Sequence, residues 1–384
     1  MKPPSGQRPA AFPSLDGLRG LAVLSVMAYH FSVGAVPLQA FDGAVLAALS
    51  AGWVGVDLFF VLSGFLITGI LLDTPRAPER FRNFYARRAL RIFPAYYGVL
   101  LFFIFVAPAI HPGAASTQIA APLKANALPL FTYTINLVVA WQGSWAASIP
   151  YFSPHFWSLA IEEQFYLFWP FLVLGRSPRV ALRWCLTALA LSVALRLGIV
   201  LAGGSPITNY TFTLGRLDGL AFGGVVACGL RIDGMSDWLA RQRATASVIA
   251  LAALAIGLFI DGRLDPYAPW TLGVVIAALG VLFAGTVHRA VEADVEARPG
   301  FLRRPALRFI GRYSYGLYIL HFPVIHLLSR AHLGVASFGT IAGSALPGVA
   351  IFALLAGGAT LLAALVSWHA IESPFLSLKR FVPR

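Results

Sequence analysis

LDGLRGLAVLSVMAYHF, residues Leu15–Phe31, is long and apolar enough to enter a membrane as a helix, yet it contains Arg19 and His30. Eleven positions separate these two residues. They therefore return to within about 20° of one helix face, roughly 16 Å apart along the axis. Each has an ordinary explanation, Arg19 as a cytoplasmic anchor and His30 as an interfacial polar residue. Ionisable groups inside membranes are costly and tend to line sites, so the shared face favours a functional role.

The composition is that of an integral membrane protein. Of the 384 residues, 58% are hydrophobic and only 12% are charged, whereas soluble domains carry about 25% charge. Apolar runs recur along the whole chain, separated by short loops. We predict an all-α, polytopic membrane domain over residues 15–370, preceded by a short cytoplasmic segment (1–14) and followed by a basic cytoplasmic tail (371–384).

The net charge of +13 does not indicate nucleic-acid binding. The basic residues lie in short loops between apolar runs, where the insertion bias on Lys and Arg explains them. Cys185 and Cys228 lie in apolar stretches and are interpreted as buried thiols. The sequence predicts neither a disulfide framework nor a metal site.

The apolar segments number eleven. They are 15–33, 52–72, 92–110, 128–141, one from Phe156 to Arg176, 184–201, 212–230, 247–260, one ending near Val287, 313–329 and 345–368. The stretch between the first two segments, to about Leu49, is expected to be a loop.

The fourth segment, Leu128–Trp141, decides the topology because it has only 14 residues and contains Asn136. If it crosses the membrane, the Arg-rich loops fall on both sides. If it dips in without crossing, every Arg-rich loop falls on the side of the N-terminus, as the positive-inside rule requires. We therefore predict about ten transmembrane helices plus one re-entrant or interfacial segment, with both termini cytoplasmic.

This orientation places seven ionisable side chains toward the outer side, where converging charges normally pair around a site. They are His30, Asp57, Glu162, Glu163, Arg196, Arg216 and Asp218. A structural ion pair explains Arg216 and Asp218 equally well, and a helix-start or packing role explains Asp57. The adjacent Glu162 and Glu163 point roughly 100° apart, so both should not face one cavity, and we favour Glu162 as the one facing inward.

Three arginines mark the inner side. Arg19, Arg88 and Arg91 lie where the first and third spans meet the cytoplasm, and Arg88 and Arg91 are one helical turn apart. Guanidinium forks at this spacing suit a polyanionic phosphate ligand, although the insertion bias is an alternative. Cations inside and a histidine with carboxylates outside suggest a ligand that spans the bilayer depth between them, and a donor with phosphates and a long thioester arm would fit.

Seven stretches, beginning with the one quoted first, carry a resemblance. They are LDGLRGLAVLSVMAYH (15–30), GVDLFFVLSGFLIT (55–68), RRALRIFPAYY (87–97), FWSLAIEEQFYLFWP (156–170), RLDGLAFGG (216–224), GRYSYGLYILH (311–321) and IESPF (371–375). In this order the chain resembles the bacterial acyltransferase family three, polytopic enzymes that O-acylate sugars of lipopolysaccharide, exopolysaccharide, Nod factors and some antibiotics. The resemblance covers nearly the whole chain, and it implies an acyl-CoA-dependent O-acyltransferase of the bacterial inner membrane.

The resemblance also implies roles for individual residues. Its Arg-x10-His pattern falls on Arg19 and His30, with His30 as catalytic base, and its Arg-x-x-Arg pattern falls on Arg88 and Arg91, which would handle acyl-CoA. The pattern Trp-Ser-Leu-x-x-Glu selects Glu162. Some relatives have an extra C-terminal hydrolase-like domain. This sequence ends ten residues after Pro374, so the membrane domain is expected to carry all of the chemistry.

Both lines together give one hypothesis. Acyl-CoA, as acetyl-CoA, is a co-substrate rather than a permanently bound cofactor, and it docks its phosphates on the three arginines. A carbohydrate or glycolipid acceptor enters from the outer side, and His30 removes its hydroxyl proton while Glu162 orients His30 or stabilises its charge. A covalent acetyl-His intermediate is an open alternative. The residues assigned to the acceptor are Asp57, Trp157, Tyr166, Arg216 and Asp218.

Two other classes of protein are alternatives. A secondary transporter of an acyl or sugar compound would also have intramembrane charges, but it gives no reason for the inner arginines, and no internal repeat is visible. A sugar-binding protein without catalysis would not need His30. The sequence does not predict the acceptor, the acyl chain length or the oligomeric state. Nor does it assign roles to Ser314 and His321, and His155 and His369 are expected to be interfacial.

Overall fold

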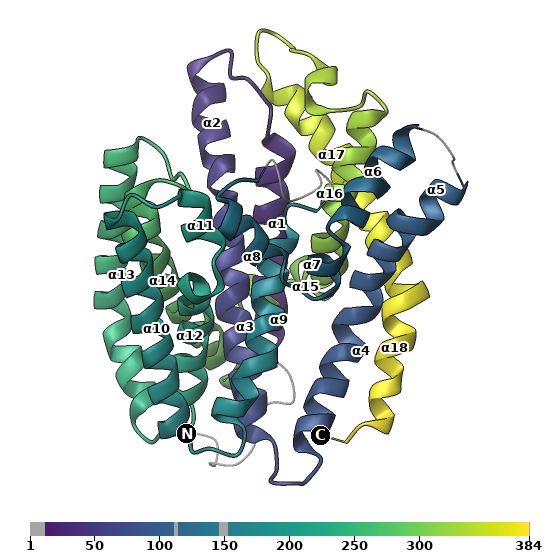
Figure 1. The fold of residues 1–384 in the computed structure, drawn as a ribbon. Helices are drawn as coiled ribbons and strands as arrows, with labels where there is room; N and C mark the ends of the chain where they lie inside the picture. Colours follow the sequence, from purple (N-terminus) through teal and green to yellow (C-terminus); the bar gives the residue numbers. More distant parts are fainter. Residues whose placement is uncertain (1–11, 111–113, 146–152, 384) are drawn as a thin grey trace.

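The computed structural model describes residues 12–110, 114–145 and 153–383, and the secondary structure in these ranges is helical apart from one isolated bridge between Ile341 and Ser344. Figure 1 shows an elongated bundle in which α10, α12, α13 and α14 form one side and α4, α17 and α18 the other, with α1, α3 and α9 between them. The helices are α1 Pro13–Ser32, α2 Ala40–Ser50, α3 Val54–Asp73, α4 Arg80–Leu101, α5 Ala107–Ile110, α6 Ala114–Ala125, α7 Ala127–Phe131, α8 Ile135–Gln142, α9 Phe156–Val173, α10 Pro178–Leu201, α11 Pro206–Thr211, α12 Thr213–Gly229, α13 Met235–Asp261, α14 Ile276–Val295, α15 Pro305–Arg312, α16 Ser314–Arg330, α17 Leu346–Ser367 and α18 Ser373–Ser377.

Within the described residues, 6 continuous helices are long and apolar enough to cross a membrane. They are Ala40–Asp73, Arg80–Ile110, Pro178–Leu201, Met235–Asp261, Thr271–Val295 and Leu346–Phe381. The all-helical prediction is confirmed, whereas about ten spans is not. The other predicted spans are α1, α9, α12 and α16, which have 20, 18, 17 and 17 residues. These four helices carry His30, Glu162, Arg216 and His321, and such ionisable residues lower the hydropathy of the helices that contain them.

The expected loop after the first span is instead helix α2, which a 3-10 turn joins to α3 to give one helix from Ala40 to Asp73. Its sequence, AFDGAVLAALS, is rich in the strong helix formers Ala and Leu, but its 11 residues are too few to stand out as a span. Asp42, in its first turn, accepts a hydrogen bond from Ser344 Oγ at 2.7 Å. This bond ties α2 to the segment that precedes α17.

The segment predicted not to cross the membrane consists of two short helices, α7 and α8, that break at Tyr133, where φ is +53°. Two amides hold the break. Asn136 donates to Thr213 Oγ1 at 2.8 Å, and Gln164 of α9 donates to the Asn136 side chain at 2.8 Å and to the Tyr133 carbonyl at 2.7 Å. The segment is therefore not one continuous helix, and its entry into the membrane without crossing stays a prediction.

Glycines bring the central helices into backbone contact. A Cβ on Gly64 of α3 would lie 1.8 Å from the Leu220 carbonyl oxygen of α12, and one on Gly20 of α1 would lie 2.4 Å from the Leu307 oxygen of α15. Small residues permit such close approach between membrane helices. The packing fixes α1, which carries both Arg19 and His30, against its neighbours.

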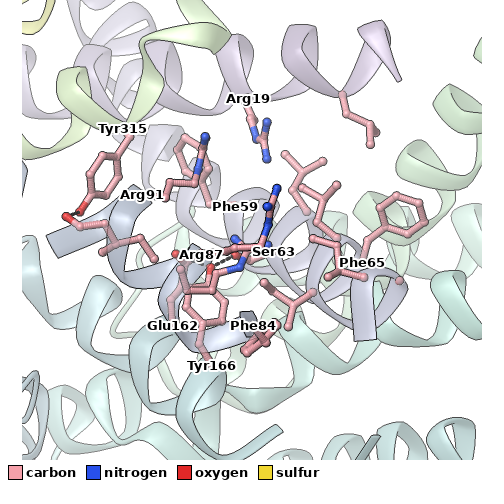
Figure 2. Close-up of a pocket in the computed structure, with 18 of the residues that line it drawn as sticks. Arg19, Phe59, Ser63, Phe65, Phe84, Arg87, Arg91, Glu162, Tyr166 and Tyr315 are labelled. Atoms are coloured by element: carbon pink, nitrogen blue, oxygen red, sulfur yellow. Dashed lines mark hydrogen bonds between the residues drawn. The ribbon is translucent and has the colours of Figure 1, made fainter. Parts of the chain in front are cut away.

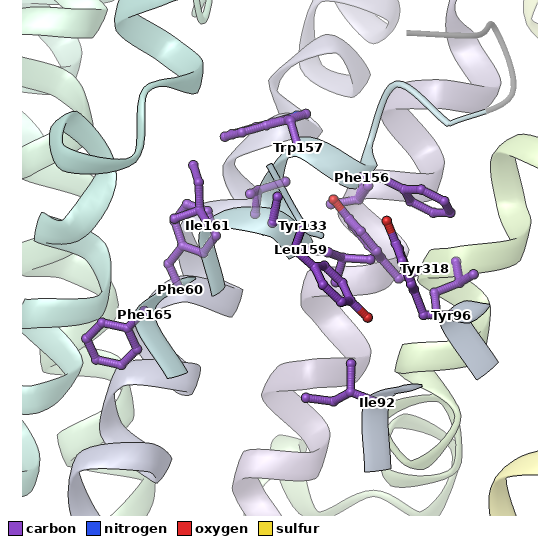
Figure 3. Close-up of a cluster of buried hydrophobic side chains, with 14 of the residues drawn as sticks. Phe60, Ile92, Tyr96, Tyr133, Phe156, Trp157, Leu159, Ile161, Phe165 and Tyr318 are labelled. Atoms are coloured by element: carbon purple, nitrogen blue, oxygen red, sulfur yellow. The ribbon is translucent and has the colours of Figure 1, made fainter. Parts of the chain in front are cut away.

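Helix α9 lies in an aromatic core. Figure 3 shows side chains of α9 among side chains from α3, α4 and α16 and that of Tyr133. The rings of Tyr96 and Phe156 are 5.0 Å apart, and those of Phe60 and Trp157 meet edge to face at 6.2 Å. Because buried rings in contact restrict one another, α9 is a rigid support for the polar residues in its middle.

Candidate functional site

A cavity of about 950 Å³ lies among α1, α3, α4, α9 and α16. Its polar lining includes Arg19, Ser63, Arg88, Arg91, Glu162, Glu163 and Tyr166. Figure 2 shows Arg19 and Arg91 on one side of this space and Glu162 with Tyr166 on the other. Phe59 and Phe65 of α3 add apolar surface. A space with a cationic wall and an apolar floor suits a ligand that has an anionic head and an uncharged arm.

Three neighbouring arginines of α4 differ in the groups that they contact. Arg87 donates to the backbone carbonyls of Lys379 and Val382 at 3.0 and 2.6 Å, so it anchors the C-terminal segment. In the part of the chain that the structure describes, neither Arg88 nor Arg91 has a carboxylate within 4.0 Å. The Arg88 guanidinium lies over the Tyr166 ring, 5.7 Å from its centre. Arg19 is bound to Asp16 at 3.2 Å.

The two adjacent glutamates both line this cavity, which contradicts the prediction that only one would face inward. The prediction treated the cavity as a narrow stripe, but a space of this volume wraps far enough around α9 to receive side chains 100° apart. Glu162 accepts a hydrogen bond from the Tyr166 hydroxyl at 3.1 Å. Tyr166 also forms a short hydrogen bond with Ser63 of α3.

His30 lies at the other end of α1, where it pairs with His321 of α16. His30 Nδ1 and His321 Nε2 are 3.0 Å apart, and His321 Nδ1 is 2.7 Å from the Tyr318 carbonyl oxygen. The His155 ring centre is 4.7 Å from that of His321. His155 is only 3% exposed, so it is buried in protein. Sequence reasoning missed the partnership of His30 and His321, although both histidines lie in the stretches that carry the family resemblance.

The expected contact between Glu162 and His30 is absent among the described hydrogen bonds, because Glu162 bonds to Tyr166 and His30 bonds to His321. His30 is also not among the residues that line the cavity. Tyr318 connects the two regions. It lines the cavity, donates or accepts a 2.6 Å hydrogen bond with Ser158, and has its ring centre 5.6 Å from that of His321.

The remaining predicted charges form two buried ion pairs. Arg216 contacts Asp57 at 2.7 Å, and Arg196 contacts Asp218 at 2.6 Å. Both arginine side chains have 0% relative exposure. The Arg216 guanidinium is also 4.8 Å from the Tyr210 ring centre and 5.8 Å from that of Trp157.

The seven charges therefore do not converge on one site. They separate into the glutamates at the cavity, His30 beside His321, and the two ion pairs. Of the five residues assigned to the acceptor, Tyr166 is the one that lines the cavity. The other four do not line it and are buried at 0 to 5% relative exposure: Asp57, Trp157, Arg216 and Asp218. Their role in acceptor binding stays a prediction.

The profile of the acyltransferase family three, described as "Acyltransferase domain", matches residues 12–368. The chain belongs to this family. Its match to the family includes the arginine-lined cavity and the histidine pair, since Arg19, Arg88, Arg91, His30 and His321 all lie within the matched residues. No solved structure matches the chain.

Among curated relatives, the chain is similar to the Listeria monocytogenes protein named peptidoglycan O-acetyltransferase OatA, with 30% identity over 329 residues, or 82% of this chain and 49% of that protein. It is 31% identical over 339 residues to Bacillus subtilis YrhL, covering 82% and 49% of the two chains. The Staphylococcus aureus O-acetyltransferase OatA is 29% identical over 337 residues, covering 83% and 51%. The chain thus spans about half the length of the curated relatives that it matches.

Proposed function

We propose that this protein is a membrane O-acyltransferase that moves an acetyl group from acetyl-CoA to a sugar hydroxyl of a surface glycan. Family membership and the names of the relatives support the acetyl group and the glycan. Peptidoglycan, which the Listeria relative's name specifies, is the first acceptor to test. The proposal includes the bacterial inner membrane as location, with both termini and the arginines on the cytoplasmic side.

The observation that carries the donor assignment is the set of cavity arginines. Arg88 and Arg91 are free of carboxylate partners among the described residues, and Arg19 joins them from α1. Guanidinium groups bind phosphate oxygens in a bidentate manner, so three of them suit the phosphates of coenzyme A. The apolar part of the cavity then receives the pantetheine arm, which carries the thioester toward Tyr318.

The chemistry is assigned to His30. Its Nε2 removes the proton of the acceptor hydroxyl, the hydroxyl oxygen bonds to the thioester carbonyl carbon, and the carbon–sulfur bond breaks. The proton passes from the imidazolium to the thiolate of coenzyme A. Attack by His30 itself, to give an acetyl-His intermediate, is the alternative order of the same bond changes.

The thioester must pass Tyr318 in this scheme, because Tyr318 lines the cavity and touches the ring of His321. Its hydroxyl bonds to Ser158 and donates to the His155 carbonyl at 3.2 Å, so the side-chain shift that this scheme requires must break both bonds. Glu162 is given a new role on this basis. It acts at the cavity, whose lining it shares with Arg19 and Arg88, rather than on His30 directly.

Transfer from acetyl-labelled acetyl-CoA tests the proposal. Membrane vesicles with the full chain are supplied with peptidoglycan oligosaccharides, and the wild type is compared with His30→Ala. If label enters the oligosaccharide with the wild type and not with His30→Ala, acetyl-CoA as donor, a glycan as acceptor and His30 as base are all supported. Undiminished transfer by His30→Ala would contradict His30 as the base. A wild type that binds acetyl-CoA but leaves all of the label on it would contradict peptidoglycan as the acceptor.

A further inference from the structure

Three histidines from different parts of the chain meet near the end of α1. His30 is on α1, His155 immediately precedes α9, and His321 is on α16. The His321 ring is fully buried, with its centre 5.0 Å from that of His30, 4.7 Å from that of His155 and 5.0 Å from that of Phe322. These contacts on several sides hold the imidazole of His321 in one orientation.

The hydrogen bonds of His321 fix which of its nitrogens carries the proton. A backbone carbonyl can only accept, so His321 Nδ1, 2.7 Å from the Tyr318 oxygen, must be the donor. In the neutral ring, His321 Nε2 is then unprotonated and accepts a hydrogen bond from His30 Nδ1 across 3.0 Å. His30 consequently carries its proton on Nδ1 and leaves Nε2 with a free lone pair.

His155 does not compete for this bond. Its Nε2 lies 3.3 Å from the Ile319 carbonyl oxygen and therefore donates to it. No carboxylate lies within 4.0 Å of His30 or His321 among the described residues. A neutral imidazole anchored on a backbone carbonyl therefore occupies the position that a carboxylate often takes beside a catalytic histidine.

We propose that His321 is a positioning residue that selects the Nδ1–H tautomer of His30, so that His30 Nε2 is the base toward the acceptor hydroxyl. The inference rests on the proposed function for its catalytic part and on geometry alone for the tautomer. When His30 takes up a proton on Nε2, its Nδ1–H continues to donate to His321, which stabilises the imidazolium without accepting a second proton.

Two amide substitutions of His321 separate this role from simple packing. Glutamine places a side-chain oxygen near the former Nε2 position, where it still accepts from His30. Asparagine places its amide near the former Nδ1 position, where it retains the bond to Tyr318 but offers nothing to His30. We expect His321→Asn to lower kcat on the order of 100-fold, as does the loss of a general base, and His321→Gln to stay within about tenfold of the wild type. The KM for acetyl-CoA should change less than about twofold in both, because the cavity arginines are untouched.

The same variants made in His30→Ala should have no further effect, because His321 acts through His30. A second measurement needs no turnover. Nitrogen-15 NMR of the full chain with labelled histidine, assigned with His30→Ala, is expected to give the Nδ1–H tautomer for His30. An Nε2–H tautomer for His30, or equal kcat values for the asparagine and glutamine variants, would overturn the inference. A His30→Ala protein that transfers normally would instead overturn the proposed base and leave the tautomer assignment to the NMR result.

Discussion

The Asp57–Arg216 pair distinguishes a structural role from acceptor binding. Its atoms are 2.7 Å apart, and the two side chains are 3% and 0% exposed. Asp57→Asn would leave the Arg216 charge buried beside aromatic rings without its partner. Breaking a buried pair in this way costs about 3–5 kcal/mol. Two unit charges about 4 Å apart at an effective dielectric of 20 interact by about 4 kcal/mol, which agrees with this range.

The matched variant replaces both charges. Asp57→Leu with Arg216→Met removes the pair and keeps an apolar volume, so it should recover most of the lost stability, because such replacements are often neutral. Unfolding by SDS in mixed micelles measures all variants. A structural pair predicts that the double variant is stable and transfers acetyl groups with an acceptor KM near the wild-type value. A stable double variant whose acceptor KM rises at least about tenfold would refute the structural role and restore the sequence prediction of acceptor binding.

Three further outcomes follow from the packing and the cavity. Gly64→Ala places a Cβ 1.8 Å from the Leu220 oxygen and should lower the free energy of unfolding by about 1–3 kcal/mol, whereas Gly358→Ala, with no atom within 4 Å, should not lower it, as SDS unfolding will measure. Affinity for acetyl-CoA, measured by calorimetry in nanodiscs, should fall steadily between about 0.05 and 0.5 M salt because exposed charge pairs are screened, and a salt-independent affinity would argue against arginine–phosphate contacts. Dephospho-CoA, which lacks one phosphate, should bind about tenfold more weakly than coenzyme A in the same assay, and equal binding would exclude that contact.

Most of the helices can be predicted from the sequence, because a run of apolar residues in a bilayer must satisfy its backbone hydrogen bonds internally and therefore forms a helix. The prediction of a loop was wrong at helix α2, which was missed because it is short. The predicted spans α1, α9, α12 and α16 are not confirmed by length and composition. These four helices carry the polar residues of the candidate site, so their hydropathy does not report whether they cross the membrane.

The candidate site was predicted in parts. Arg19, Arg88 and Arg91, which helical spacing and loop charge grouped in the sequence, all line one cavity, and their role in donor binding stays a prediction. The partner of His30 was wrong, because Glu162 and His321 lie in different regions of the bundle and no sequence pattern reports which helices pack against α1. The sequence analysis also placed the two ion pairs and the glutamates in one site. It did so because loop charge predicts only the depth of a residue in the membrane and not its position in the membrane plane.

Binding of acetyl-CoA to the purified full chain tests the central claim, that the arginine-lined cavity is the donor site and His30 a separate chemical centre. The double variant Arg88→Ala with Arg91→Ala should bind on the order of 100-fold more weakly than the wild type. Arg82→Ala, which changes an exposed arginine of the same helix outside the cavity, should bind normally. His30→Ala should also bind normally while failing to transfer. Unchanged binding by the Arg88–Arg91 variant, in a protein that unfolds like the wild type, would contradict the account.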